Sequence, residues 1–184
     1  MLARALDQDG SNALAAPDAP DRISTTCRHF MSGVLTHLDE LVAIFLPNAN
    51  SYRRIVPGAS APFSRARGID NRTAAIRVLN QEPESTRTEL RSCGGDVNLY
   101  LGLAALLSAG VDGIRNQTDP GPPAKGDLDE QDIARLPQNW GDAFDASDWA
   151  RHAFGKDFCP NYSTIKRYEY DRFRRTVTDT ERDL

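Results

Sequence analysis

Apolar residues between positions 24 and 47 recur at the spacing of an amphipathic helix. Ser24, followed by two threonines, is a typical residue for the start of a helix, and Pro47 cannot continue one. The sequence therefore predicts a helix that begins at Ser24 and ends before Pro47. The apolar positions behind this prediction include Phe30, Val34, Leu38, Leu41 and Phe45. Residues 1–22 are rich in Asp, Ala and Pro, and they predict a loop.

Short strand patterns follow a turn-rich segment at positions 56–58. Three strands are predicted, at residues 62–67, 72–79 and 86–92. We expect these strands to form a small antiparallel sheet.

Helical patterns return in the second half of the chain. Residues 98–114 are apolar on nearly every side, which predicts a helix buried against the sheet. Two further helices are expected at about 140–154, with Gly155 as a stop, and at 163–176. The elements together predict an α+β fold in which helices pack a small antiparallel sheet.

Composition limits the class of protein. The chain has 184 residues, of which 40% are hydrophobic, so it can form one domain or a large piece of one and is not disordered as a whole. Residues 99–111 would span roughly 20 Å as a helix, against roughly 30 Å for a bilayer core. No apolar signal segment opens the chain, and three widely spaced cysteines do not make a disulfide framework. We expect a cytoplasmic protein that does not enter membranes.

Charge is unevenly distributed, although the formal net charge is only −4. Residues 50–92 contain eight arginines and four acidic residues, and no lysine precedes Lys125. A guanidinium group holds a carboxylate or phosphate through two parallel hydrogen bonds, which lysine cannot do. The plain alternative is a solvated basic face.

A possible anion site centres on the strand predicted at 86–92. Alternate residues of a strand share a face at a spacing of roughly 6.6 Å, so Arg87, Glu89 and Arg91 should project side by side. Guanidinium groups that gather closely repel each other unless an anion lies among them. A carboxylate in that position also suits a hard divalent cation. Other arginines that an antiparallel sheet could bring to this face are Arg53, Arg54, Arg72 and Arg77.

Four motifs occur in a fixed order along the chain. They are Asn-Ser-Tyr-Arg-Arg-Ile-Val-Pro-Gly at 50–58, Asn-Arg-Thr-Ala-Ala-Ile-Arg at 71–77, Arg-Thr-Glu-Leu-Arg at 87–91, and Asn-Leu-Tyr-Leu at 98–101 running on to 114. Their order and spacing resemble the C-terminal part of the glutamine synthetase catalytic domain. The resemblance implies that residues 1–184 form this C-terminal portion, with the N-terminal β-grasp domain and the first part of the catalytic domain absent.

The resemblance implies an ATP-dependent reaction that joins ammonia or an amine to the γ-carboxylate of glutamate through γ-glutamyl phosphate. Its implied cofactors are ATP and Mg²⁺ or Mn²⁺, and its full-length form is implied to be a ring-shaped homo-oligomer. Arg54 and Arg91 are implied to hold glutamate. Arg72 is implied to lie between substrate and nucleotide and to act in catalysis. Arg72, Arg77 and Arg87 are implied to bind the nucleotide.

Glu89 is implied to be a ligand of one catalytic metal ion. It is the one metal ligand that the resemblance identifies in this chain, and a divalent cation usually needs about six oxygen ligands. We therefore expect the chain alone to lack ligase activity.

One departure from the family pattern concerns the nitrogen donor. Members that use ammonia carry an acidic residue just before the Ala-Pro that follows Val-Pro-Gly, whereas this chain has Ser60 there. Without that carboxylate the site has less reason to prefer ammonium, so a larger amine is possible, as in the γ-glutamyl-polyamine and γ-glutamyl-amide synthetase branch. Ammonia stays open as the other donor.

Two other classes of function need to be weighed. A non-catalytic protein could keep the arginines to bind glutamate, phosphate or nucleotide, and could act through association with full-length relatives. Binding of nucleic acid is disfavoured, because the chain is acidic and its basic segment lacks aromatic residues interleaved for base stacking. We expect His29, Cys93 and the aromatic residues of the last 50 positions to be structural.

Overall fold

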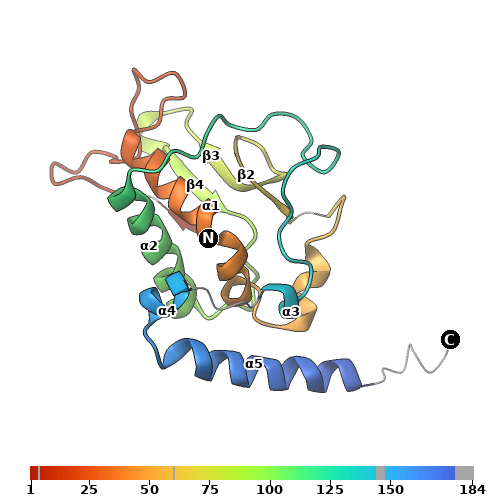
Figure 1. Cartoon of the computed structure of the whole chain (residues 1–184). Coiled ribbons are helices and arrows are strands. Elements are labelled where there is room, and N and C mark those ends of the chain that lie inside the picture. The colour runs from red at the N-terminus through yellow and green to blue at the C-terminus, as the bar shows by residue number, and fades with distance from the viewer. Residues whose placement is uncertain (4, 60, 144–147, 177–184) are drawn as a thin grey trace.

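The computed structural model describes residues 1–3, 5–59, 61–143 and 148–176. In this part of the chain a four-stranded sheet lies behind one long helix, with a second helix beside it and a third across one end (Figure 1). The strands are β1 (Leu2–Ala3), β2 (Ser64–Ile69), β3 (Ala74–Leu79) and β4 (Arg87–Leu90), in the order β1-β4-β3-β2. The predicted α+β class is confirmed.

Helix α1 (Thr25–Phe45) forms the centre of the core. The Ser24 hydroxyl accepts a hydrogen bond from the backbone N–H of Cys27 at 3.0 Å, which caps the helix as the sequence predicted. The helix ends at Phe45, and Leu46 caps it directly before Pro47. Its buried face includes Met31, Val34, Leu38, Leu41 and Phe45.

The edge strand β1 was not predicted, because residues 1–22 were expected to form a loop. Leu2 pairs with Glu89 and Ala3 with Thr88 in antiparallel register. The backbone carbonyl of Leu90 also accepts a hydrogen bond from the amino group of Met1 at 2.8 Å. A strand of two residues is too short to show an alternating pattern, so sequence analysis had no signal for it.

The sheet is mixed rather than wholly antiparallel. Strands β3 and β4 pair in antiparallel fashion, as expected, but β2 and β3 are parallel, with Ile69 opposite Val78. The connection at 70–73 turns back beside β2, and a Cβ atom on Gly68 would lie only 2.5 Å from the Cβ of Asn71. Asp70 begins this connection with a left-handed φ of 46°. The absent side chain of Gly68 therefore leaves room for the return, which strand propensities alone do not reveal.

Helix α2 (Leu99–Asn116) forms where an apolar helix was predicted, but it packs mainly on α1 and is not buried on every side. Its buried face consists largely of Gly and Ala, whereas Leu99 is 66% exposed and Tyr100 is 86% exposed. Leu103, Leu107 and Val111 continue this exposed stripe at intervals of four residues. The small residues fit against α1, so the large apolar residues project away from it. No helix among the described residues has the length and apolarity to cross a membrane.

The C-terminal segment forms α3 (Trp140–Ala143), α4 (Asp148–Phe154) and α5 (Phe158–Arg175). The helix predicted at 140–154 includes residues 144–147, which lie outside the described residues. Gly155, with φ of 86°, separates α4 from α5 and confirms the predicted stop. Helix α5 begins five residues before the predicted position. It is tied to α1 by the Tyr162 hydroxyl, which donates to the carbonyl of Ala43 at 2.9 Å.

The crossing of α1 and α2 depends on two glycines. A Cβ atom on Gly33 would lie 2.1 Å from the carbonyl oxygen of Ala109, and one on Gly113 would lie 2.1 Å from that of His29. These neighbours are backbone atoms of packed helices, so they cannot move aside without separating the helices.

We expect Gly33→Ala to lower the free energy of unfolding by about 1–3 kcal/mol, because the strain of overpacking exceeds the gain in helix propensity of about 1 kcal/mol. Urea unfolding followed by circular dichroism measures the change. Gly95→Ala is the matched control, because a Cβ there meets nothing within 4 Å. An equal effect of both substitutions would contradict the close-packed crossing.

Candidate functional site

Strand β4 divides its side chains between the core and the opposite face of the sheet. Thr88 and Leu90 are buried, whereas Arg87, Glu89 and Arg91 are half-buried on the other face. This alternation was predicted from the Arg-x-Glu-x-Arg spacing.

Arg77 of β3 lies opposite Glu89 in the antiparallel register. Its Nη1 donates to Glu89 Oε2 at 3.1 Å, and its Nε donates to Asp70 Oδ1 at 2.9 Å. These hydrogen bonds, with that to Asp70 as the larger cause, raise the pKa of the Arg77 guanidinium. Arg77 therefore bridges two carboxylates from different segments.

Arg91 approaches the same carboxylate from the end of β4. Its Nη1 lies 3.8 Å from Glu89 Oε2, and its Nε donates to the backbone carbonyl of Arg72 at 3.1 Å. Burial lowers the pKa of Arg91 despite the favourable charge of Glu89. The nearby positive charges that lower it further are those of Arg77, Arg72 and Arg54. We call these four arginines, with Glu89, the arginine cluster.

Arg54 reaches the cluster from η1 (Ala49–Arg54), a 3₁₀ helix after α1. Its Nη1 donates to the backbone carbonyl of Cys93 at 3.0 Å, just beyond the end of β4. Burial raises the pKa of the Cys93 thiol, in line with the expectation of an unreactive structural cysteine.

The position of η1 is fixed by Asp96. Its Oδ2 accepts hydrogen bonds from the Ser51 hydroxyl at 2.5 Å and from Asn48 Nδ2 at 2.7 Å. Asn48 and Ser51 also form a capping box at the start of η1. The residues after β4 are thus joined to the turn that carries Arg54.

Arg72 lies at the margin of the cluster and Arg87 lies beside it, whereas Arg53, which was also predicted for this face, is exposed. Arg72 is exposed on the connection between β2 and β3, close enough to Arg91 to influence its pKa. Arg87 shares the face of Glu89, but its Nη1 donates to the carbonyl of Ser85 at 3.1 Å. Arg87 therefore lies beside the cluster, and its guanidinium is hydrogen-bonded to the backbone just before β4.

Sequence analysis missed one member of the site, and one arginine of the basic segment has a structural role that the sequence did not reveal. Asp70 contacts Arg77 but had been counted only as an acidic residue, although a turn position between two strands was a usable signal. Arg67 belongs to the basic segment, yet it is only 2% exposed and donates to the carbonyl of Gly121 at 2.6 Å. It also lies 3.4 Å from Asp21. Arg67 is a structural residue of the core.

The cluster suits anions better than a metal ion. Arg77 and Arg91 share one carboxylate, and two further guanidinium groups lie close enough to influence Arg91. An additional phosphate or carboxylate would relieve the repulsion among these groups. Glu89 already contacts Arg77 and Arg91, and the described residues contain no group of three His, Cys, Asp or Glu side chains that could hold a metal. The described part of this chain therefore does not fit a divalent cation by itself. Ser60, the position linked to the nitrogen donor, lies outside the described residues.

Comparison with known proteins assigns the family. Residues 4–184 match the family model described as glutamine synthetase, catalytic domain. The chain belongs to the glutamine synthetase family. This confirms the resemblance inferred from the motifs.

Relatives of this glutamine synthetase-family chain include two kinds of named enzyme. It is 38% identical to a glutamine synthetase of Halobacterium salinarum, and the alignment covers 96% of this chain and 41% of that protein. It is 39% identical to a gamma-glutamylethanolamide synthetase of Streptomyces coelicolor, and this alignment covers 95% of this chain and 38% of that protein. The chain thus spans about two fifths of the length of these relatives.

Solved structures show the same relation. GmaS without ligand superposes with a TM-score of 0.82 at 30% identity, covering 100% of this chain and 43% of that one. A GmaS complex with ADP superposes with the same TM-score of 0.82 at 31% identity, covering 96% of this chain and 43% of that one.

We expect Glu89→Gln to tighten the binding of inorganic pyrophosphate when no divalent cation is present. The Glu89 carboxylate competes with an added anion for Arg77 and Arg91. Its loss should make the binding free energy more favourable by about 1 kcal/mol, which is roughly fivefold in affinity. Isothermal titration calorimetry measures the change. Glu84→Gln, an exposed site in the same basic segment, should leave the affinity unchanged. Equal or weaker binding by Glu89→Gln would contradict an anion site at the cluster.

Proposed function

We propose that this chain is the C-terminal portion of a catalytic domain that ligates ammonia or an amine to the γ-carboxylate of glutamate at the expense of ATP. It supplies the arginine side of the site, and the reaction passes through γ-glutamyl phosphate. The observation that carries the proposal is the gathering of Arg54, Arg72 and Arg77 near Arg91, with Glu89 contacting both Arg77 and Arg91. The full-length form is a cytoplasmic homo-oligomeric ring.

In this proposal, different arginines of the cluster bind the two anionic ligands. Arg54 and Arg91, which come from η1 and the end of β4, hold the glutamate substrate. Arg77, with Arg87 beside it, binds the nucleotide phosphates, while Arg72 lies between the two ligands. ATP supplies the phosphoryl group. Fixed guanidinium groups stabilise the charge that grows on phosphoryl oxygens during transfer more than they stabilise the ground state.

Glu89 serves as one ligand of Mg²⁺ or Mn²⁺ in the complete site. The described residues of this chain offer too few further donors to hold the metal. The proposed role of Glu89 requires additional carboxylates or histidines from another polypeptide segment.

An amine larger than ammonia is the preferred nitrogen donor in this proposal. Ser60 replaces an acidic side chain that would attract ammonium, and one relative at 39% identity is named a gamma-glutamylethanolamide synthetase. Relatives at similar identity are named glutamine synthetase, so ammonia is the alternative donor.

A second candidate is a non-catalytic protein that binds glutamate, phosphate or nucleotide and associates with full-length relatives. The small number of metal-ligating groups among the described residues favours it. The reading frame upstream of the Met1 codon separates the two. A continuous frame that encodes acidic strand motifs and a histidine-rich segment supports a ligase portion, whereas a stop codon supports the binding protein.

The division of roles predicts that single substitutions affect one ligand each. We expect Arg77→Gln to weaken ADP binding about tenfold or more and Arg54→Gln to do the same for L-glutamate, because each loses a hydrogen bond between charged groups worth about 1.5–3 kcal/mol. Calorimetric titration of each ligand in turn measures both. Arg53→Gln, the exposed neighbour of Arg54, is the control and should change neither affinity. If neither ligand binds saturably, or both variants lose both ligands equally, the proposed roles are wrong.

Turnover by the chain alone tests how complete the site is. With ATP, glutamate, ethanolamine and Mg²⁺, we expect ADP to appear no faster than without protein, because one carboxylate cannot hold the metal. A coupled ADP assay measures this. Release of ADP that needs both glutamate and the amine would show that this chain already holds a complete ligase site.

A further inference from the structure

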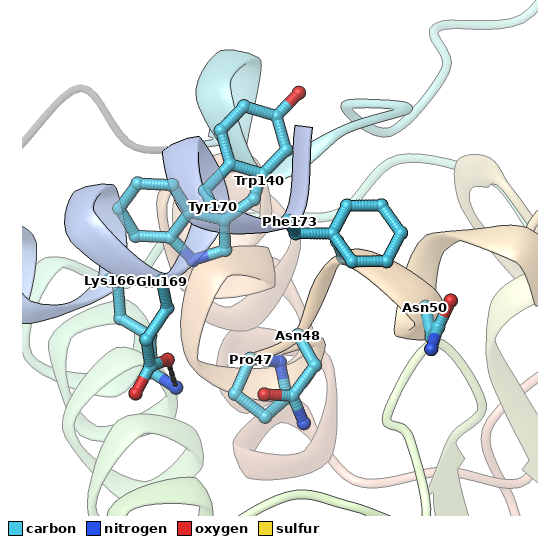
Figure 2. A pocket seen from close by; sticks show the side chains of 9 residues that line it. Pro47, Asn48, Asn50, Trp140, Lys166, Glu169, Tyr170 and Phe173 are labelled. Carbon is cyan, nitrogen blue, oxygen red and sulfur yellow. Dashed lines mark hydrogen bonds and ion pairs between the residues drawn. The ribbon is translucent and has the colours of Figure 1, made fainter. Parts of the chain in front are cut away.

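A pocket of about 380 Å³ lies between the turn after α1, helix α3 and helix α5. Figure 2 shows aromatic rings of Trp140, Tyr170 and Phe173 on one side and Pro47 and Asn48 on the other. None of the lining residues belongs to the arginine cluster. The volume of the pocket is within the range of small-molecule sites, which is roughly 300–1,000 Å³.

Trp140 and Tyr170, two of the aromatic residues that line the pocket, are held in place by their neighbours. Trp140 is only 2% exposed, and its ring centroid lies 6.2 Å from that of Tyr170. The guanidinium of Arg174 lies 5.8 Å from the centre of the Tyr170 ring, and the Tyr170 hydroxyl lies 3.4 Å from Asn139 Oδ1. These contacts fix Trp140 and Tyr170, so these two rings offer a preformed surface for an apolar group.

The polar side of the pocket is an ion pair. Lys166 Nζ and Glu169 Oε2 are 2.6 Å apart on one face of α5. The Lys166 side chain is only 16% exposed, whereas that of Glu169 is 51% exposed. In Figure 2 both side chains extend beside the pocket next to Trp140.

This pair selects the charge of a ligand. A simple amine would engage Glu169 and leave Lys166, whose side chain is largely buried, without its counter-ion. A simple carboxylate would engage Lys166 and leave Glu169 without its counter-ion. A ligand that carries both charges can pair with both residues at once, so no charge is left without a partner.

We propose that this pocket binds a zwitterionic α-amino acid with an apolar side chain. The ligand carboxylate pairs with Lys166, its ammonium group pairs with Glu169, and its side chain packs against Trp140, Tyr170 and Phe173. The site is separate from the proposed ligase site and does not depend on it.

The test uses the full chain, with L-phenylalanine as the probe and phenethylamine and 3-phenylpropanoate as analogues of single charge. We expect saturable binding of L-phenylalanine by calorimetry, with a change in tryptophan fluorescence because Trp140 lines the pocket. Both analogues should bind at least tenfold more weakly. Lys166→Gln and Glu169→Gln should each lower the affinity for L-phenylalanine about tenfold, the loss of one charged hydrogen bond.

The charge-swapped double variant, Lys166→Glu with Glu169→Lys, is the decisive control. It again offers both charges, so it should recover most of the affinity lost in the single variants. Tyr168→Ala, an exposed position of α5 outside the lining, should bind like the original chain. Circular dichroism checks that each variant is folded.

The substitution Arg91→Gln separates this site from the arginine cluster, and it should leave the affinity for L-phenylalanine unchanged. Loss of L-phenylalanine binding in Arg91→Gln would assign the binding to the arginine cluster and overturn the proposal. No saturable binding at millimolar concentrations would overturn it, and so would equal affinity for phenethylamine. None of these results bears on the ligation of glutamate.

Discussion

Repulsion between guanidinium groups is the constraint that organises the candidate site. Arg77 and Arg91 can remain close because Glu89 lies between them, and the antiparallel register of β3 and β4 puts Arg77 directly opposite that carboxylate. A shift of one residue in this register would turn Arg77 toward the core, because successive strand residues point to opposite faces. The pairing of the two strands is therefore a condition for the chemistry as much as for the fold.

The parts of the structure that were predicted depend on local patterns. The cap at Ser24 and the apolar spacing defined α1, and alternation along β4 placed Glu89 and Arg91 on one face. Local rules apply there because a helix or strand with one buried face repeats that face in its sequence.

The parts that were missed depend on contacts between distant segments. The parallel pairing of β2 and β3 requires the return of the chain past Gly68, and the burial of Arg67 requires Asp21 and the carbonyl of Gly121. The apolar content of α2 indicated a helix but did not show which face packs. Glycine and alanine decide that face, because they allow a close approach to α1. Family motifs supplied the candidate residues, and only the fold showed that Asp70 joins Arg77 while Arg87 bonds to Ser85.

The hydrogen bonds of Asp96 have a mechanical consequence. They join the turn that carries Arg54 to the segment that follows β4, and the Arg54 side chain donates a hydrogen bond to the carbonyl of Cys93 in that segment. Any displacement of this end of the strand must carry Arg54 along with it. Arg54 and Arg91, which come from segments far apart in the sequence, are thus held at a fixed spacing by these hydrogen bonds.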